Sequence, residues 1–145
     1  MPMKINPKDL LDKYQDLLPY DDPFELFVDD NGELLGYTVK YDDDDESEVI
    51  SVKKEADINK IGELYPDSVR IGCGEYTPYD DAIIGYVEDG IGNARIVYSY
   101  ELICESLSKD GDISYDYAVD WVEYNTLGSL PNIPTNVRPY IIYSV

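Results

Sequence analysis

The sequence predicts an α+β fold, with a largely antiparallel sheet that contains a β-meander in its first half and two packed helices in its second half. Three observations favour this class. Several short segments alternate apolar and polar residues, other segments repeat apolar residues at helical spacing, and turn-forming residues separate them. At 145 residues the chain fits a single compact domain, residues 1–145, within which residues 1–67 and 79–145 form two halves.

The first half is expected to begin with a helix and continue with three strands, in the order α-β-β-β. Asn6 is a favourable N-cap, and leucines recur at helical spacing until Pro19 ends the element. Alternation predicts strands over residues 24–28 and 34–41, joined by a turn whose Asn-Gly pair favours a hairpin. After a charged loop, residues 49–52 form the third strand and complete the meander.

The second half is expected to read β-β-α-α-β. Before it, residues 55–64 form a short helix, and the glycine- and proline-rich residues 66–80 form a linker or crossover. Ser114 caps the last helix, and three prolines make residues 130–139 irregular. The expected strands cover residues 82–87, 95–98 and 140–145, and the expected helices cover residues 100–107 and 114–127.

The net charge is the most unusual feature of the composition. The chain has 31 acidic and 11 basic residues, so its net charge is −20. A protein with this excess is repelled by nucleic acid and anionic membranes and attracted to basic surfaces. The acidity could also serve solubility or adaptation to salt alone. The chain also has 15 tyrosines beside two phenylalanines and one tryptophan, and tyrosine is typical of binding surfaces. Together, the acids and tyrosines favour an interaction face.

Several common kinds of catalytic site are excluded by residue counts. The chain has no histidine, which rules out nucleophilic sites that use a histidine base and zinc sites that contain histidine. Cys73 and Cys104 are far apart in sequence and are expected to be reduced, buried thiols. The glycine pairs lack the third glycine of a dinucleotide fingerprint, and no phosphate-binding loop is present. Arg95 and Arg138 are expected to be internal salt-bridge partners rather than anion ligands.

The segment AVDWVEYNTLG, residues 118–128, has the clearest helical pattern. Ala118, Val122 and Thr126 can share one buried face with Val119. Tyr117, Trp121 and Tyr124 form a neighbouring aromatic stripe, which is expected to pack in the core. Asn125 suits a helix end, where its side chain can bond backbone groups.

Four motifs of the second half together resemble a group of small proteins common in bacteriophage and prophage genomes. They are the strand AIIG (residues 82–85), the junction VYSY (97–100), the helix AVDWVEYN (118–125) and the strand PYII (139–142). Tyr117 stands where that group usually has an acid, and residues 130–138 lengthen the tail. The resemblance covers about residues 79–145. It implies a phage or mobile-element setting and carries over no catalytic residue.

These features together predict a non-enzymatic acidic phage protein. It is expected to bind and inhibit a host nucleic-acid-handling defence protein, of anti-CRISPR or anti-restriction type, by mimicking DNA or RNA. The partner would be a basic surface of a nucleic-acid-binding effector or nuclease in the host cytoplasm, without direct nucleic-acid or membrane binding and without a cofactor. The expected contacts are acidic residues that flank the predicted hairpin: Asp21, Asp22, Asp29, Asp30, Asp42, Asp43, Asp44, Asp45, Glu46 and Glu48.

Two other interpretations stay open. The chain could be an accessory or structural phage protein, for which the sequence has no discriminating feature. It could also be a Mg²⁺-dependent hydrolase that uses clustered carboxylates, since such enzymes need only Asp and Glu. The lack of a basic patch to hold an anionic substrate disfavours the hydrolase.

Overall fold

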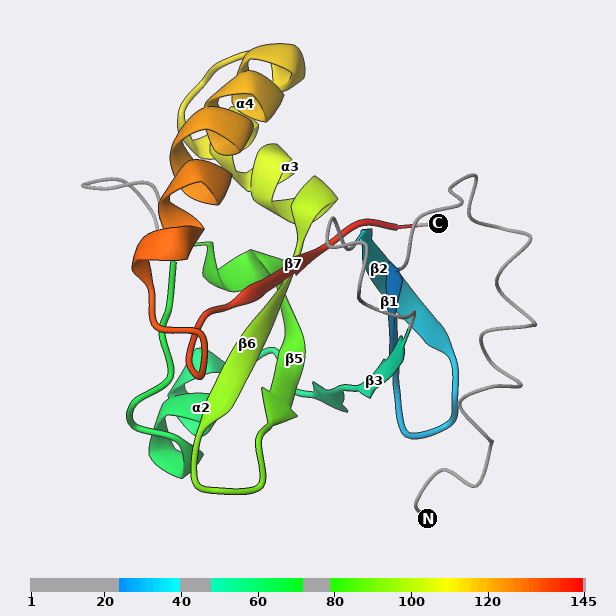
Figure 1. Ribbon diagram of the computed structural model, residues 1–145. Helices are drawn as coiled ribbons and strands as arrows, with labels where there is room; N and C mark the ends of the chain where they lie inside the picture. Colours follow the sequence, from blue (N-terminus) through cyan, green and yellow to red (C-terminus); the bar gives the residue numbers. More distant parts are fainter. Residues whose placement is uncertain (1–23, 40–47, 72–78, 145) are drawn as a thin grey trace.

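The computed structural model describes residues 24–39, 48–71 and 79–144, and it confirms the α+β class (Figure 1). The expected helix between Asn6 and Pro19 and the charged loop after the second strand lie outside the described residues. The strands are β1 (Phe24–Val28), β2 (Leu34–Val39), β3 (Glu48–Ser51), β4 (Lys53–Lys54), β5 (Ile83–Glu88), β6 (Ala94–Ser99) and β7 (Tyr140–Ile142). The helices are α2 (Ile58–Leu64), α3 (Tyr100–Asp110) and α4 (Tyr115–Trp121), and α4 continues as the π-helical segment η2 (Val122–Leu127). Short 3₁₀ turns are η1 (Asp80–Ala82) and η3 (Leu130–Asn132).

The strands form two sheets, with the orders β2-β1-β3 and β4-β5-β6-β7. The β1–β2 hairpin forms as expected, and its turn includes Gly32 at φ 78°, a conformation that glycine adopts without strain. The expected meander is wrong, because β3 pairs with β1 in parallel instead of continuing antiparallel beside β2. Alternation determines which residues of a strand share a face, but it does not determine the partner or the direction. Both sheets are mixed, since β7 is also parallel to its neighbour β6.

Backbone hydrogen bonds connect the two sheets on one side, and the chain itself connects them on the other. Beyond β7, Tyr143 exchanges two hydrogen bonds of 2.9 Å with Tyr37 of β2. On the other side, Val52 follows β3, donates to Val28 O at 2.8 Å, and leads directly into β4 of the second sheet. The two sheets therefore share one apolar cluster. The backbones approach closely at β2, where a Cβ atom on Gly36 would lie 2.7 Å from Tyr143 O.

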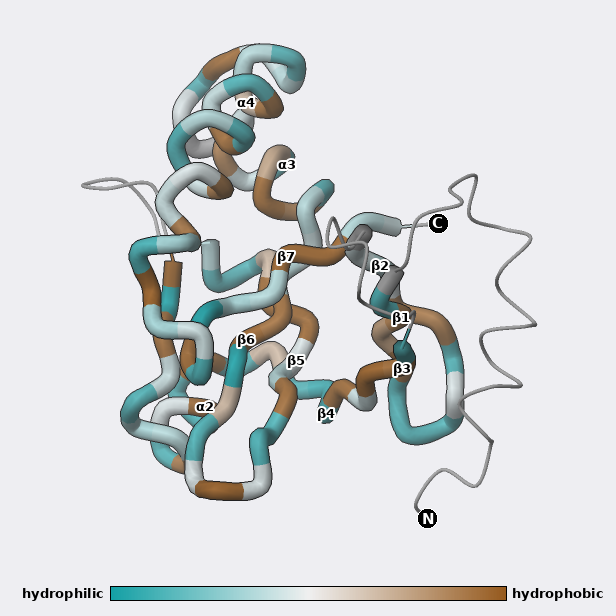
Figure 2. The backbone as a smooth tube through the Cα atoms, in the orientation of Figure 1, coloured by the Kyte–Doolittle hydropathy of each residue, from teal (hydrophilic) through white to brown (hydrophobic). Residues whose placement is uncertain are grey.

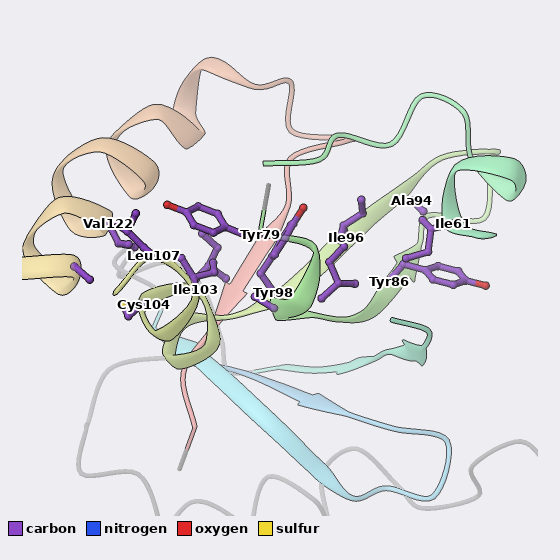
Figure 3. Packing of buried hydrophobic residues seen from close by; sticks show 14 residues of the cluster. Ile61, Tyr79, Tyr86, Ala94, Ile96, Tyr98, Ile103, Cys104, Leu107 and Val122 are labelled. Atoms are coloured by element: carbon purple, nitrogen blue, oxygen red, sulfur yellow. The ribbon is translucent and has the colours of Figure 1, made fainter. Parts of the chain in front are cut away.

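Strands β5 and β6 place their side chains alternately into two apolar clusters. Ile96 and Tyr98 face the helices and belong to the larger cluster, which Figure 3 shows between β5–β6 and the helical segments. Val97, between them, faces the first sheet and packs with Phe27, Val52 and Ile142. The second cluster therefore contains residues from both halves of the chain. Figure 2 shows the apolar stretches that β6 and β7 bring side by side.

Replacing Gly85 by alanine is expected to lower the free energy of unfolding by about 1–3 kcal/mol, because the new Cβ atom would overlap with the carbonyl of Lys53 on β4. Gly62 is the matched control, since nothing lies within 4 Å of a Cβ atom there and alanine is the better helix former by about 0.5–1 kcal/mol. Urea unfolding followed by the fluorescence of Trp121 measures both variants. A Gly85→Ala protein as stable as the parent would contradict the close approach of β4 and β5.

Candidate functional site: an acidic, tyrosine-bearing helical face

Three of the ten acidic residues expected to contact a partner are described by the structure: Asp29, Asp30 and Glu48. Asp29 is only 5% exposed, and its Oδ1 accepts hydrogen bonds from the backbone N–H groups of Asn31 (2.9 Å) and Glu33 (3.0 Å). Asp29 therefore stabilises the hairpin turn and exposes little surface to a partner. The other seven, which lie outside the described residues, are Asp21, Asp22, Asp42, Asp43, Asp44, Asp45 and Glu46.

Asp30 and Glu48 are exposed but lie at opposite ends of β1. Glu48 is in register with Glu25 near the start of β1, whereas Asp30 follows the end of that strand. A strand advances by about 3.3 Å per residue, so roughly 15 Å of strand separates the two positions. The described part of the hairpin region does not gather its acids into one cluster.

Helices α3 and α4 form a second candidate region, and each begins at a serine cap. Ser99 Oγ accepts from Leu102 N, and Ser114 Oγ accepts from Tyr117 N at 3.2 Å, as the sequence predicts for Ser114. Ser108 Oγ also donates to Ile113 O at 2.6 Å, which fastens the turn between the helices. The capped helices pack on each other and on β6, away from the β1–β2 hairpin (Figure 1).

The inward side of α4 and η2 follows the sequence pattern. Ala118, Val122 and Thr126 are all buried, and Asn125 Nδ2 donates to Trp121 O at 3.2 Å. The π-helical turn, which is wider than an α-helical turn, keeps this four-residue spacing on the buried side through Thr126.

The outward side of the same helix carries exposed tyrosines and carboxylates. Tyr117 is 59% exposed and Tyr124 is 84% exposed, so the expected core packing of these two rings is wrong. Trp121 is half-buried and packs against the larger apolar cluster. Asp116 and Asp120 are exposed beside the tyrosines. We call Asp116, Tyr117, Asp120 and Tyr124 the acid–tyrosine face.

The region around this face has little compensating positive charge. Residues 100–132 contain seven acidic residues and one basic residue, Lys109, so they contribute −6 of the net −20. Within the described residues, no lysine or arginine lies at ion-pair distance from Asp116 or Asp120. Described cations do pair with carboxylates elsewhere, in Lys53–Glu88 (2.7 Å), Lys60–Glu55 (3.9 Å) and Arg70–Asp80 (2.8 Å).

Two other acids of the helices have internal roles. Glu101 Oε1 accepts from the backbone N–H (3.2 Å) and the hydroxyl (2.7 Å) of Ser144, so it holds the end of the chain against α3. Glu123 Oε1 accepts from the Tyr100 hydroxyl at 3.0 Å, which ties η2 to the start of α3. Asp116 and Asp120 make no such bond among the described residues and are left to the solvent.

Cys104 is a free, fully buried thiol on α3, as expected for a structural cysteine. Its pKa is raised from 9.0 to about 11, mainly by burial and to a smaller extent by the carboxylates of Glu101, Glu123 and Glu105, although a hydrogen bond with Tyr100 acts in the opposite direction. At neutral pH the side chain is therefore a thiol, which is a poor nucleophile. Cys73 lies outside the described residues.

The two arginines of the second half interact with other parts of the protein. Their described partners are mainly a carbonyl oxygen, a hydroxyl and an aromatic ring rather than carboxylates. Arg95 stacks over Tyr140 at 3.7 Å from the ring centroid, and its Nη1 donates to the Tyr140 hydroxyl at 2.8 Å. Arg138 donates from Nε (3.1 Å) and Nη2 (2.9 Å) to Ile133 O. Both border a hollow of about 270 Å³, which Glu25 also lines. The arginines fasten the irregular segment before β7 to β6.

In the described ranges, no three His, Cys, Asp or Glu side chains converge so that they could hold a metal ion. The same ranges contain no helix that is both long and apolar enough to cross a membrane. No protein-family model, no curated protein and no solved structure matches this chain. The candidate site therefore rests on the geometry of the acid–tyrosine face.

Folding stability is expected to fall as the pH rises from about 9 to about 11. The folded state binds the Cys104 proton more tightly than the unfolded state does, because the pKa rises from 9.0 to about 11 on folding. The resulting stabilisation is complete below pH 9 and is lost as the thiol ionises. Urea midpoints at pH 8, 10 and 11 measure it, and a Cys104→Ala variant should show a shallower decline over this interval. Burial also raises the pKa of Tyr98, to about 12, so some decline should remain in that variant. Equal pH dependence in both proteins would contradict the assignment.

Proposed function

We propose that this chain is a non-enzymatic phage protein that binds and inhibits a host nucleic-acid-handling defence protein, of anti-CRISPR or anti-restriction type, by presenting acidic groups where nucleic acid would bind. The acid–tyrosine face is the observation that carries the proposal. It combines uncompensated carboxylates with two exposed tyrosine rings on a capped, well-packed helix. Interfaces are enriched in tyrosine, and charge of one sign steers a partner of the opposite sign.

The two carboxylates of the acid–tyrosine face lie where they can meet one basic surface. Asp116 and Asp120 are four residues apart, which is about 6 Å along a helix, and they lie on the same side. Duplex DNA carries one charge per ~1.7 Å of axis, and proteins that bind it present lysine and arginine to its phosphates. Carboxylates on a well-packed helix can pair with such basic side chains in place of phosphates.

The phage setting comes from the sequence resemblance of residues 79–145, and the cytoplasmic location comes from the two isolated cysteines, which are typical of a reducing compartment. The proposal moves the main described contact surface from the β1–β2 hairpin to α4, because Asp29 is engaged in the hairpin turn.

Affinity capture from a bacterial lysate at low salt is expected to enrich nucleic-acid-binding proteins, and duplex DNA should release them by competition. An Asp116→Asn/Asp120→Asn variant should capture at least about fivefold less of these nucleic-acid-binding proteins, because the substitutions remove the charges that attract the partner. Recovery should also fall steeply as salt is added, since exposed charges are screened over about 10 Å at 0.1 M.

The matched control is Glu63→Gln/Asp67→Asn, which removes two exposed charges on and just after α2 and leaves the same net charge. It should bind like the parent. If capture of nucleic-acid-binding proteins falls equally in the two variants, binding depends on total charge and the acid–tyrosine face has no special role. If duplex DNA releases none of the captured proteins, the proposed mimicry is wrong.

A further inference from the structure

The acid–tyrosine face has a carboxylate between two aromatic rings. Asp120 is three residues after Tyr117 and four residues before Tyr124, and all three side chains are exposed. Helical side chains three or four residues apart are neighbours, with Cβ atoms about 5–6 Å apart. The carboxylate therefore has an accessible ring one turn away on each side.

This combination discriminates between the two kinds of basic side chain. The face of a tyrosine ring attracts a cation, and a carboxylate accepts two parallel hydrogen bonds from a guanidinium. The guanidinium of arginine is planar, so it can stack on a ring and present its edge to a carboxylate at once. The ammonium group of lysine is a compact, strongly hydrated charge that can make the ion pair but cannot stack.

The protein contains a related arrangement at Arg95, although its hydrogen-bond acceptor is a hydroxyl and not a carboxylate. The Arg95 guanidinium lies 3.7 Å from the centroid of the Tyr140 ring while its Nη1 donates to the Tyr140 hydroxyl. One guanidinium in this fold therefore lies over a tyrosine ring and donates a hydrogen bond to the same tyrosine. At Tyr117 and Tyr124 the rings are uncovered, and no described cation occupies the equivalent position.

We infer that Tyr117, Asp120 and Tyr124 form a docking site for an arginine side chain, and that the partner presents an arginine-rich rather than a lysine-rich segment. This inference rests on the proposed function, because it specifies the basic surface that the acid–tyrosine face binds. Arginine is also the residue that nucleic-acid-binding proteins use for planar, two-point recognition of phosphate groups and base edges.

The test compares acetylated, amidated nonapeptides of arginine and of lysine, which carry equal charge, in titrations of the full chain at low salt. The sole tryptophan, Trp121, lies on the same helix and reports binding by its fluorescence, with calorimetry as the second measurement. The arginine peptide is expected to bind about three- to tenfold more tightly than the lysine peptide. Tyr117→Ala/Tyr124→Ala should abolish this preference and leave lysine-peptide binding within about twofold of the parent. Asp120→Asn should weaken binding of both peptides.

Control variants separate loss of the rings from loss of the fold. Tyr117→Phe/Tyr124→Phe keeps both ring faces and should keep the preference, and Leu64→Ala removes an exposed apolar side chain from α2 and should change nothing. Equal binding of the two peptides would overturn the arginine site while leaving the proposed basic partner intact. A preference that survives Tyr117→Ala/Tyr124→Ala would place arginine recognition elsewhere and also overturn the site. If neither peptide binds at low salt, both the inference and the proposed function are wrong.

Discussion

Strand β6 is the element on which the rest of the structure depends, because its side chains are needed by two apolar clusters at once. Ile96 and Tyr98 complete the cluster under the helices, and Val97 completes the cluster shared with the first sheet. All three are fully buried, so a polar side chain at any of them would lose its hydration. Tyr98 is accommodated because its hydroxyl accepts a hydrogen bond from Ile71 N at 3.0 Å, which also positions the segment after α2.

The end of the chain makes the helices and the first sheet parts of one body. Strand β7 runs parallel to β6, and Tyr143, which follows it, pairs with Tyr37 on β2. The ring centroids of Tyr143 and Tyr100, the first residue of α3, are 4.8 Å apart. Ser144 then bonds to Glu101 on the same helix. The acid–tyrosine face is thus carried by helices that are held by both caps and core, and a binding surface on such a support loses little conformational entropy on binding.

Five of the described acids fall into two groups that the sequence does not distinguish. Asp29, Glu101 and Glu123 accept hydrogen bonds from backbone or hydroxyl groups and stabilise local structure. Asp116 and Asp120 face solvent with no described cation beside them, and like charges one turn apart repel each other. Asp116 also lies in the first turn of α4, where its negative charge interacts favourably with the helix dipole, whereas Asp120 lies beyond that turn.

The sequence by itself determined the α+β class, most element positions from β1 to β7, the serine cap of α4 and the buried face of Ala118, Val122 and Thr126. These features depend on residues close together in the chain, whose periodicity and capping chemistry are readable locally. Only the tertiary structure decided that β3 lies parallel to β1, that Asp29 belongs to a turn, and that Tyr117 and Tyr124 point to solvent while Trp121 is half-buried. A stripe of aromatic residues has the same spacing whether it is buried or exposed. Here β6 and α3 pack against the side of α4 that carries Ala118. The side that carries the tyrosines is left exposed to solvent.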